Sequence, residues 1–342
     1  MSSVELEFHA INDCVNQIIH RLGKDLRVAM PLGLGKPVEL IDALYRRACE
    51  DSSLSLTIFT ALSLERPHES DPIRGRLLNP VFDRLYANYS EPLYLQDERK
   101  GQLPANISLC EFYFKAGSRL GHAAAQRNYI SSNYTHAARD VVARGSNLVI
   151  QLLAREGNKL SMSCNPDTSA EVVARLNDGG RDYVAVGVVH PDLPFMYGDA
   201  EVDADQFDFL ATTDSGLHGL FQVPRLPPIP DTDYAIGLRA SALIADGGTL
   251  QLGIGAMGDA IVQSVLLRHQ RNEDYRELLK RFDVDEHCAQ LVETVGGRGV
   301  FEKGLYGATE MFVEGFLHLF QGGILRRPVY DFWALQQLIN LG

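Results

Sequence analysis

The sequence has 342 residues, a length that corresponds to about two domains of ordinary size. Hydrophobic residues make up 45% of it and charged residues 22%, a globular composition that excludes intrinsic disorder and collagen-like repeats. The formal net charge of −12 opposes a polyanion-binding surface, so nucleic acid is not an expected partner.

Targeting and metal signals are also missing from the sequence. No run approaches the roughly 20 apolar residues that a membrane-spanning helix needs, and the first residues lack the basic start and apolar core of a signal peptide. The five cysteines form no CxxC pair, which is typical of free thiols in a reducing compartment, and the ten histidines form no HxxxH or HExxH motif. We therefore expect a cytoplasmic protein with no membrane partner and no metal.

Apolar segments rich in β-branched residues alternate with amphipathic segments along the chain. The first strand is expected at 26–31, and the spacing of apolar residues over 38–48 predicts a helix after it. Further strands are expected at 54–62, 107–114, 146–154, 183–191 and 248–253. This alternation predicts an α/β fold with mainly parallel, covered sheets.

A proline-rich segment and an internal echo predict two lobes. Four prolines fall within 223–230, which excludes a helix or a central strand and indicates a linker between lobes at 1–222 and 231–342. The segment 26–38 resembles 249–260, since both read as a strand, a GxG turn and an amphipathic helix. This similarity has two interpretations: the chain contains two similar lobes, or the two segments are alike by chance.

The second glycine turn, Gly253 to Gly258, matches GxGxxG between an expected strand and an expected helix. This context suggests an NAD-dependent oxidoreductase, which requires a strand ending in an acidic residue about 20 positions on. The chain instead continues with a charged, helical stretch at 268–281, so the dehydrogenase is a less favoured alternative. Backbone N–H groups at a helix start also stabilise a phosphate or an oxyanion.

Longer motifs around this turn resemble the acetyl-CoA hydrolase/transferase family of class I CoA-transferases. They are DGGTLQLGIGAMGDA at 246–260 and TEMFVEG at 309–315, preceded in the same order by HPDLPFMYG at 190–198 and YISSNY at 129–134. The resemblance implies two similar α/β lobes with mainly parallel sheets. It also implies coenzyme A as a substrate rather than a permanent cofactor, a short carboxylic acid as its partner substrate, and a homodimer.

By position, the family's catalytic glutamate is Glu310. The resemblance implies that its carboxylate attacks a short-chain, acetyl-CoA-like thioester and that a glutamyl-CoA thioester follows, which a second carboxylate or water resolves. The helical spacing of Phe312, Phe316 and Phe320 predicts that Glu310 begins a helix, where the macrodipole favours a carboxylate. Glu314, one turn later, is the nearest rival.

The two glycine turns are candidate binding loops. As the family's GxG turn, Gly253, Ile254, Gly255, Ala256 and Met257 would offer backbone donors to the thioester oxyanion and to CoA. Gly33 and Gly35 form the corresponding turn in the first lobe.

Two features depart from the family pattern. The second lobe stops soon after the glutamate segment, so we expect it to be incomplete, which makes an inactive fragment or a CoA-binding relative the alternative to an enzyme. A charged insert at about 268–303 ends with GGRG at 296–299, which we expect to be a surface excursion rather than a loop near the active site.

Overall fold

A computed structural model of the chain describes residues 7–31, 35–61, 63–164, 166, 168–212, 218–220, 228–309, 312–330 and 332–341. The chain divides into two compact units, Met1–Pro224 (unit 1) and Arg225–Gly342 (unit 2). The division falls inside the linker expected at 223–230, of which residues 223–227 lie outside the described residues.

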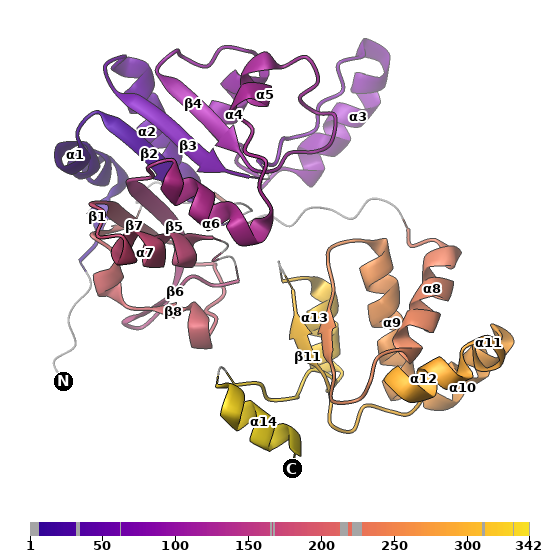
Figure 1. Cartoon of the computed structure of the whole chain (residues 1–342). Helices are drawn as coiled ribbons and strands as arrows, with labels where there is room; N and C mark the ends of the chain where they lie inside the picture. The colour runs from indigo at the N-terminus through magenta and orange to yellow at the C-terminus, as the bar shows by residue number, and fades with distance from the viewer. Residues whose placement is uncertain are drawn as a thin grey trace. The chain divides into compact units, whose positions relative to one another are not determined.

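Unit 1 is built on a mainly parallel sheet, which confirms the predicted α/β class (Figure 1). Its strands are β1 (His9–Ala10), β2 (Asp25–Ala29), β3 (Ser55–Thr60), β4 (Ile107–Glu111), β5 (Leu148–Glu156), β6 (Lys159–Ser161), β7 (Val184–Val189), β8 (Glu201–Val202) and β9 (Phe209–Thr212). The parallel part has the order β1-β9-β7-β5-β2-β3-β4, while β6 pairs antiparallel with β5 and β8.

Helices connect the parallel strands of unit 1. They are α1 (Ile11–Leu22), α2 (Val38–Glu50), α3 (Pro72–Leu85), α4 (Leu93–Arg99), α5 (Ala123–Asn128), α6 (Tyr134–Ala143) and α7 (Ser169–Asp178), with 3₁₀ turns at Gly198–Ala200 and Ala204–Gln206. The first residues of α3 explain why it begins there: the Asp71 side chain accepts hydrogen bonds from the N–H groups of Ile73 and Arg74, and Pro72 occupies the first turn.

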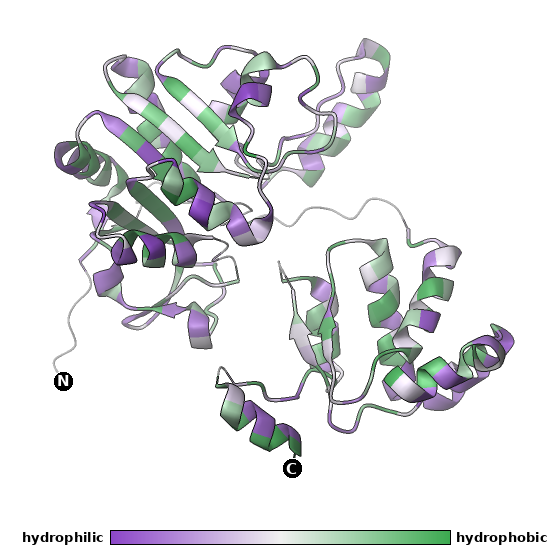
Figure 2. Ribbon diagram, in the orientation of Figure 1, coloured by the Kyte–Doolittle hydropathy of each residue, from purple (hydrophilic) through white to green (hydrophobic). Residues whose placement is uncertain are grey.

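Alternation along the strands gives the sheet two buried faces. Val28 and Ile58 pack in one apolar cluster with α1, α2 and α4, whereas the next residues along the same strands, Ala29 and Phe59, pack in another with α6 and α7. Figure 2 shows how apolar residues predominate along these strands. A sheet covered on both faces explains why its strands read as continuous apolar runs.

Unit 2 contains a short parallel sheet and several helices. Its elements are α8 (Asp231–Ala242), β10 (Thr249–Gln251), α9 (Ala256–Gln270), α10 (Asn272–Arg281), α11 (Val284–His287), α12 (Ala289–Val295), β11 (Tyr306–Ala308), α13 (Glu314–Gln321) and α14 (Trp333–Leu341). Like β2 and α2 in unit 1, β10 and α9 form a strand, a turn and a helix, as the echo predicted.

The charged insert at 268–303 folds into helices that have an apolar core of their own. Tyr275 and Leu279 of α10 and Val292 of α12 are buried together with Leu238 and Ala242 of α8. The expectation that residues 296–299 form a surface excursion is wrong. A Cβ atom at Gly296 would lie 2.0 Å from the Ala242 carbonyl oxygen, so the backbone there packs directly against the end of α8.

A buried arginine fastens the insert to the rest of unit 2. Arg268 is 1% exposed, and its Nη1 donates to the carbonyls of Ser241 and Ile244 at 2.8 and 2.7 Å while its Nε donates to Gly299 at 2.7 Å. The guanidinium also lies over the Phe301 ring, 4.3 Å from its centroid. One side chain thus holds the end of α8 and the segment before β11.

A polar cluster lies at the start of α2 in unit 1. His218 Nδ1 lies 3.0 Å from both carboxylate oxygens of Glu39, and His190 Nε2 contacts the His218 carbonyl at 2.8 Å. Burial opposes ionisation of Glu39, but the hydrogen bonds and charge of His218 outweigh it and lower the Glu39 pKa. Asp42, one turn along the helix, has the opposite behaviour, since burial raises its pKa to about 6.

We expect Gly237→Ala to destabilise unit 2, because a Cβ atom there would lie 2.6 Å from the Ala260 carbonyl oxygen where α8 meets α9. Overpacking of this kind costs about 1–3 kcal/mol. Urea unfolding followed by circular dichroism measures the loss. Gly299→Ala is the matched control, since a Cβ atom at Gly299 meets nothing within 4 Å; equal losses in the two variants would contradict the packing argument.

We expect Asp42→Asn to stabilise the protein increasingly as the pH rises from 4 to 7. The folded-state pKa of about 6 lies above the ordinary value of 3.8, so the stability contributed by protonated Asp42 is complete below that value and is lost through pH 6. Asparagine keeps an acceptor for the Leu93 N–H, which Asp42 Oδ1 accepts at 2.9 Å. The gain at pH 7 is about 3 kcal/mol, because each unit of pKa difference corresponds to about 1.4 kcal/mol.

Urea unfolding of both proteins across this pH range measures the difference in unfolding free energy. Asp203→Asn, at an exposed position, is the control. A difference between Asp42→Asn and the parent that stays constant with pH would exclude the buried acid as its source.

Candidate functional site

The pairing of β10 with β11 brings two sequence motifs to one edge of the unit-2 sheet. The strands are parallel, with Gln251 opposite Ala308. Just beyond them, Thr309 Oγ1 donates to the Leu252 carbonyl at 3.0 Å, and the Leu252 N–H donates to the Ala308 carbonyl at 3.4 Å. The next residues in the two segments are Gly253 and Glu310; Glu310 and Met311 lie outside the described residues.

The second glycine turn is open on the surface of unit 2. Gly255 precedes the first residue of α9 and has a φ of 148°, which residues with a Cβ rarely adopt. Cβ atoms at Gly253 and Gly255 would meet nothing within 4 Å, and Ile254 is 74% exposed. The third glycine of the motif, Gly258, is required for steric reasons, because a Cβ atom there would lie 2.7 Å from the Gly253 carbonyl oxygen.

The start of α9 supplies backbone donors to this turn. No side chain caps the helix, and Asp259 is the first of its residues whose N–H donates along the helix, to the Gly255 carbonyl. The N–H groups of Ala256 and Met257 therefore precede the helical ladder, as expected of the first residues of a helix. Such groups suit an anion or a developing oxyanion.

The predicted helix around the glutamate begins later than expected. α13 starts at Glu314, with Val313 before it in an extended conformation, so the prediction that Glu310 begins this helix is wrong. Phe316 and Leu319 are buried, whereas Phe312 and Phe320 are 48% and 67% exposed. The phenylalanine stripe is thus only partly core, and the macrodipole acts on Glu314 rather than on Glu310.

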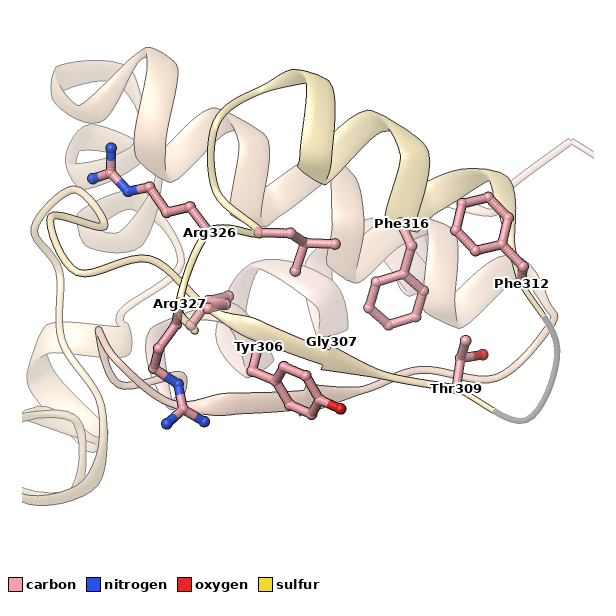
Figure 3. Close-up of a pocket in the computed structure, with 9 residues that line it drawn as sticks. Tyr306, Gly307, Thr309, Phe312, Phe316, Arg326 and Arg327 are labelled. Atoms are coloured by element: carbon pink, nitrogen blue, oxygen red, sulfur yellow. The ribbon is translucent and has the colours of Figure 1, made fainter. Parts of the chain in front are cut away.

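A cavity of about 210 Å³ adjoins the residues on either side of Glu310 and Met311 (Figure 3). Thr309, Phe312 and Phe316 line it at one end, and Arg326 and Arg327 line it beyond Tyr306 at the other. The close packing of the Phe316 ring on β11 requires a glycine at position 307, where a Cβ atom would lie 2.5 Å from the ring.

The two arginines were not among the sequence candidates. Arg327 Nη2 donates to Thr249 Oγ1 at 2.7 Å and its guanidinium lies 5.9 Å from the Tyr306 ring centroid, while Arg326 donates to the carbonyls of Phe301 and Glu302. Their position three and four residues after the last of the two glycines that follow α13 was the available signal, but adjacent arginines in a sequence read first as a solvated surface.

The first glycine turn belongs to unit 1. Gly33 lies outside the described residues, and Gly35 is a buried turn residue between β2 and α2. Next to it, Lys36 Nζ donates to the Ala61 carbonyl, just after β3, at 2.9 Å. In the sheet, β2 lies between β3 and β5, and the chain connections on its two sides run in opposite directions. Open α/β sheets commonly bind ligands at such a position.

Three further expectations concern a dinucleotide site, a metal site and a membrane-spanning helix. The segment after the GxGxxG turn continues through α9 into α10, so no strand carries the acidic residue that a dinucleotide site requires there. Across the described part of the chain, no three histidine, cysteine, aspartate or glutamate side chains form a metal-binding group. Among the same residues, none of the helices is both long and apolar enough to span a bilayer.

Comparisons with known proteins relate the chain to CoA-transferases. No family model matches it. A segment of 89 residues is 32% identical to 4-hydroxybutyrate coenzyme A transferase of Clostridium kluyveri and covers 26% of this chain and 19% of that protein.

Solved structures of RipA share the fold. RipA from Yersinia pestis is 16% identical, with a TM-score of 0.57 over 93% of this chain and 59% of RipA. A point mutant of RipA is 14% identical, with a TM-score of 0.59 over 93% of this chain and 58% of the mutant. The chain thus spans less than two thirds of the length of these relatives. The chain therefore shares the fold of these structures, and an 89-residue segment of it is similar in sequence to a CoA-transferase.

Proposed function

We propose that this protein transfers CoA between a short-chain acyl thioester and a carboxylate, with Glu310 as the nucleophile. The observation that carries the proposal is the pairing of β10 with β11. It fixes Thr309 beside Leu252, so the chain enters the Glu310 segment next to the open glycine turn. The motifs around this turn resemble the acetyl-CoA hydrolase/transferase family, and an 89-residue segment is similar to a CoA-transferase; both likenesses suggest the chemistry for which these parts are suited.

In the proposed reaction the Glu310 carboxylate attacks the thioester carbonyl carbon, the carbon–sulfur bond breaks and CoA leaves as a thiolate. The thiolate then attacks the glutamyl carbonyl of the resulting anhydride, which releases the free acid and leaves a glutamyl-CoA thioester. A second carboxylate reverses these steps and takes the CoA, and Glu310 returns to its ionised form. Water in place of the second carboxylate gives hydrolysis.

The glycine turn has a defined part in this scheme. Each attack places negative charge on a carbonyl oxygen, and the first N–H groups of α9 are suitable donors to it. The exposure of Ile254 and the open space around Gly253 and Gly255 support access of a substrate to this backbone. We assign the oxyanion and CoA contacts to Gly253, Ile254, Gly255, Ala256 and Met257.

The alternative is that this chain binds CoA without turning it over. The observation that favours it is the extent of the likeness, which reaches 58–59% of the RipA chains. Binding of CoA to the 342-residue protein, measured by calorimetry, without exchange of labelled CoA between acids would support this alternative over transfer.

We expect Glu310→Gln to reduce CoA transfer by a factor of about 10³ or more, because an amide cannot form the anhydride. Incubation with acyl-CoA followed by borohydride reduction and peptide mass analysis should show modification at position 310 in the parent and none in the variant. Glu314→Gln, in the first turn of α13, is the matched control and should keep both activity and labelling. Labelling at 314, or none anywhere in an active preparation, would refute the assignment.

We expect Gly255→Ala to lower the transfer rate by about 10²–10³, the usual cost of a displaced oxyanion donor. The physical reason is the φ of 148° at Gly255, which alanine avoids at the expense of the turn geometry. Steady-state kinetics with acetyl-CoA and a carboxylate measures the rate. Gly299→Ala should keep the parental rate, and circular dichroism checks that both variants are folded; an unimpaired Gly255→Ala enzyme would remove the turn from the mechanism.

A further inference from the structure

Unit 1 contains a second cavity, of about 310 Å³, which the proposed transferase chemistry does not use. It lies against β4, the last strand of the sheet, and is also lined from α4 by Glu98 and from α5 by Ala124 and Ala125. Its size falls within the range of small-molecule sites.

Two buried carboxylates line this cavity. Glu98 is 2% exposed and Glu111, the last residue of β4, is 4% exposed. Among the described residues, neither oxygen of Glu98 and only one oxygen of Glu111 accepts a hydrogen bond. Buried carboxylate oxygens without donors are costly, so these three atoms call for a donor from a bound group.

The nearby cations do not satisfy these oxygens. Arg119 Nη1 lies 2.7 Å from a Glu65 oxygen, and its Nη2 lies 3.5 Å from Glu98 and 4.0 Å from Glu111. The guanidinium is therefore oriented toward Glu65. Burial raises the Glu111 pKa, and Arg119 and Lys36 offset that effect only in part. Glu65 also has Arg99 Nη1 at 3.9 Å from its Oε2, whereas Arg119 is the arginine beside both Glu98 and Glu111.

His122 lines the cavity beside Glu98. Its Nδ1 accepts the Ala125 N–H at 3.1 Å. Its Nε2 lies 3.1 Å from the Glu98 carbonyl oxygen and 3.4 Å from Glu98 Oε1, and the hydrogen bond of this nitrogen is to the carbonyl rather than to the carboxylate.

The remaining wall is apolar. Leu103, Ile107, Leu109 and Phe114 line it beside the carboxylates. A divalent metal ion held by two carboxylates keeps several water ligands, which would face this apolar wall, and no metal-binding group of three side chains is found among the described residues. An organic cation with a short carbon chain matches both surfaces.

We propose that this cavity binds a primary alkylammonium ion, whose three N–H donors meet the unsatisfied oxygens of Glu98 and Glu111 and whose carbon chain lies on the apolar wall. The proposal is independent of the reaction at Glu310, because the cavity and every residue named for it belong to unit 1.

The test is a ligand-observed NMR titration of the full chain with n-butylammonium and, separately, with n-butanol, a neutral molecule of similar shape. We expect saturable binding of n-butylammonium alone. Glu98→Gln should weaken it about tenfold or more, as expected for loss of a buried charge-assisted hydrogen bond. Ala124→Trp, at an exposed position that lines the cavity, should do the same by filling it while keeping both carboxylates.

Glu171→Gln, at an exposed position of α7, is the matched control and should bind like the parent. Thermal unfolding of each variant shows whether it is folded, and Ala124→Trp keeps the test decisive if Glu98→Gln is not. Absence of saturable binding, equal binding of n-butanol, or unchanged affinity in folded Glu98→Gln or Ala124→Trp would each overturn the proposal.

Discussion

The register of two short strands is the constraint on which the candidate site depends. β10 and β11 come from segments more than 50 positions apart, and between them the chain forms α9 and the helices of the insert. The parallel pairing nevertheless puts Leu252 next to Thr309, so the open glycine turn and the segment that contains Glu310 start from the same place. A slip of one residue would reverse the faces of β11 and move Gly307 away from the Phe316 ring.

Most strands were predictable because they are buried on both faces and read as continuous apolar runs; β2, β3, β5 and β7 all fall within expected segments or extend beyond them by one or two residues. The start of α13 was not predictable from the spacing of phenylalanines. Helical spacing includes Phe312, yet the residues before Glu314 are extended, and only tertiary packing separates buried Phe316 from exposed Phe320.

The buried charges of unit 1 escaped the sequence analysis for a different reason. Glu98, Glu111 and Arg119 come from α4, from the end of β4 and from the segment after it, and no sequence motif singles out any of them. Burial of these side chains results from the way α4 and the segment after β4 fold onto the edge of the sheet. Interpretation from sequence is weakest where charges are brought together from different helices, strands and loops, since no periodicity marks them.

Arg268 has a consequence for the dynamics of unit 2. Its guanidinium binds the carbonyls of Ser241 and Ile244 on the approach to β10 and that of Gly299 on the approach to β11. If the helical insert opened, the Arg268 guanidinium would become exposed and would lose the hydrogen bonds by which it connects the two segments that lead into the sheet. Amide protons of α10 and of β11 should then exchange with solvent in a single cooperative event, so that an apparently peripheral group of helices shares the lifetime of the sheet edge that carries the candidate site.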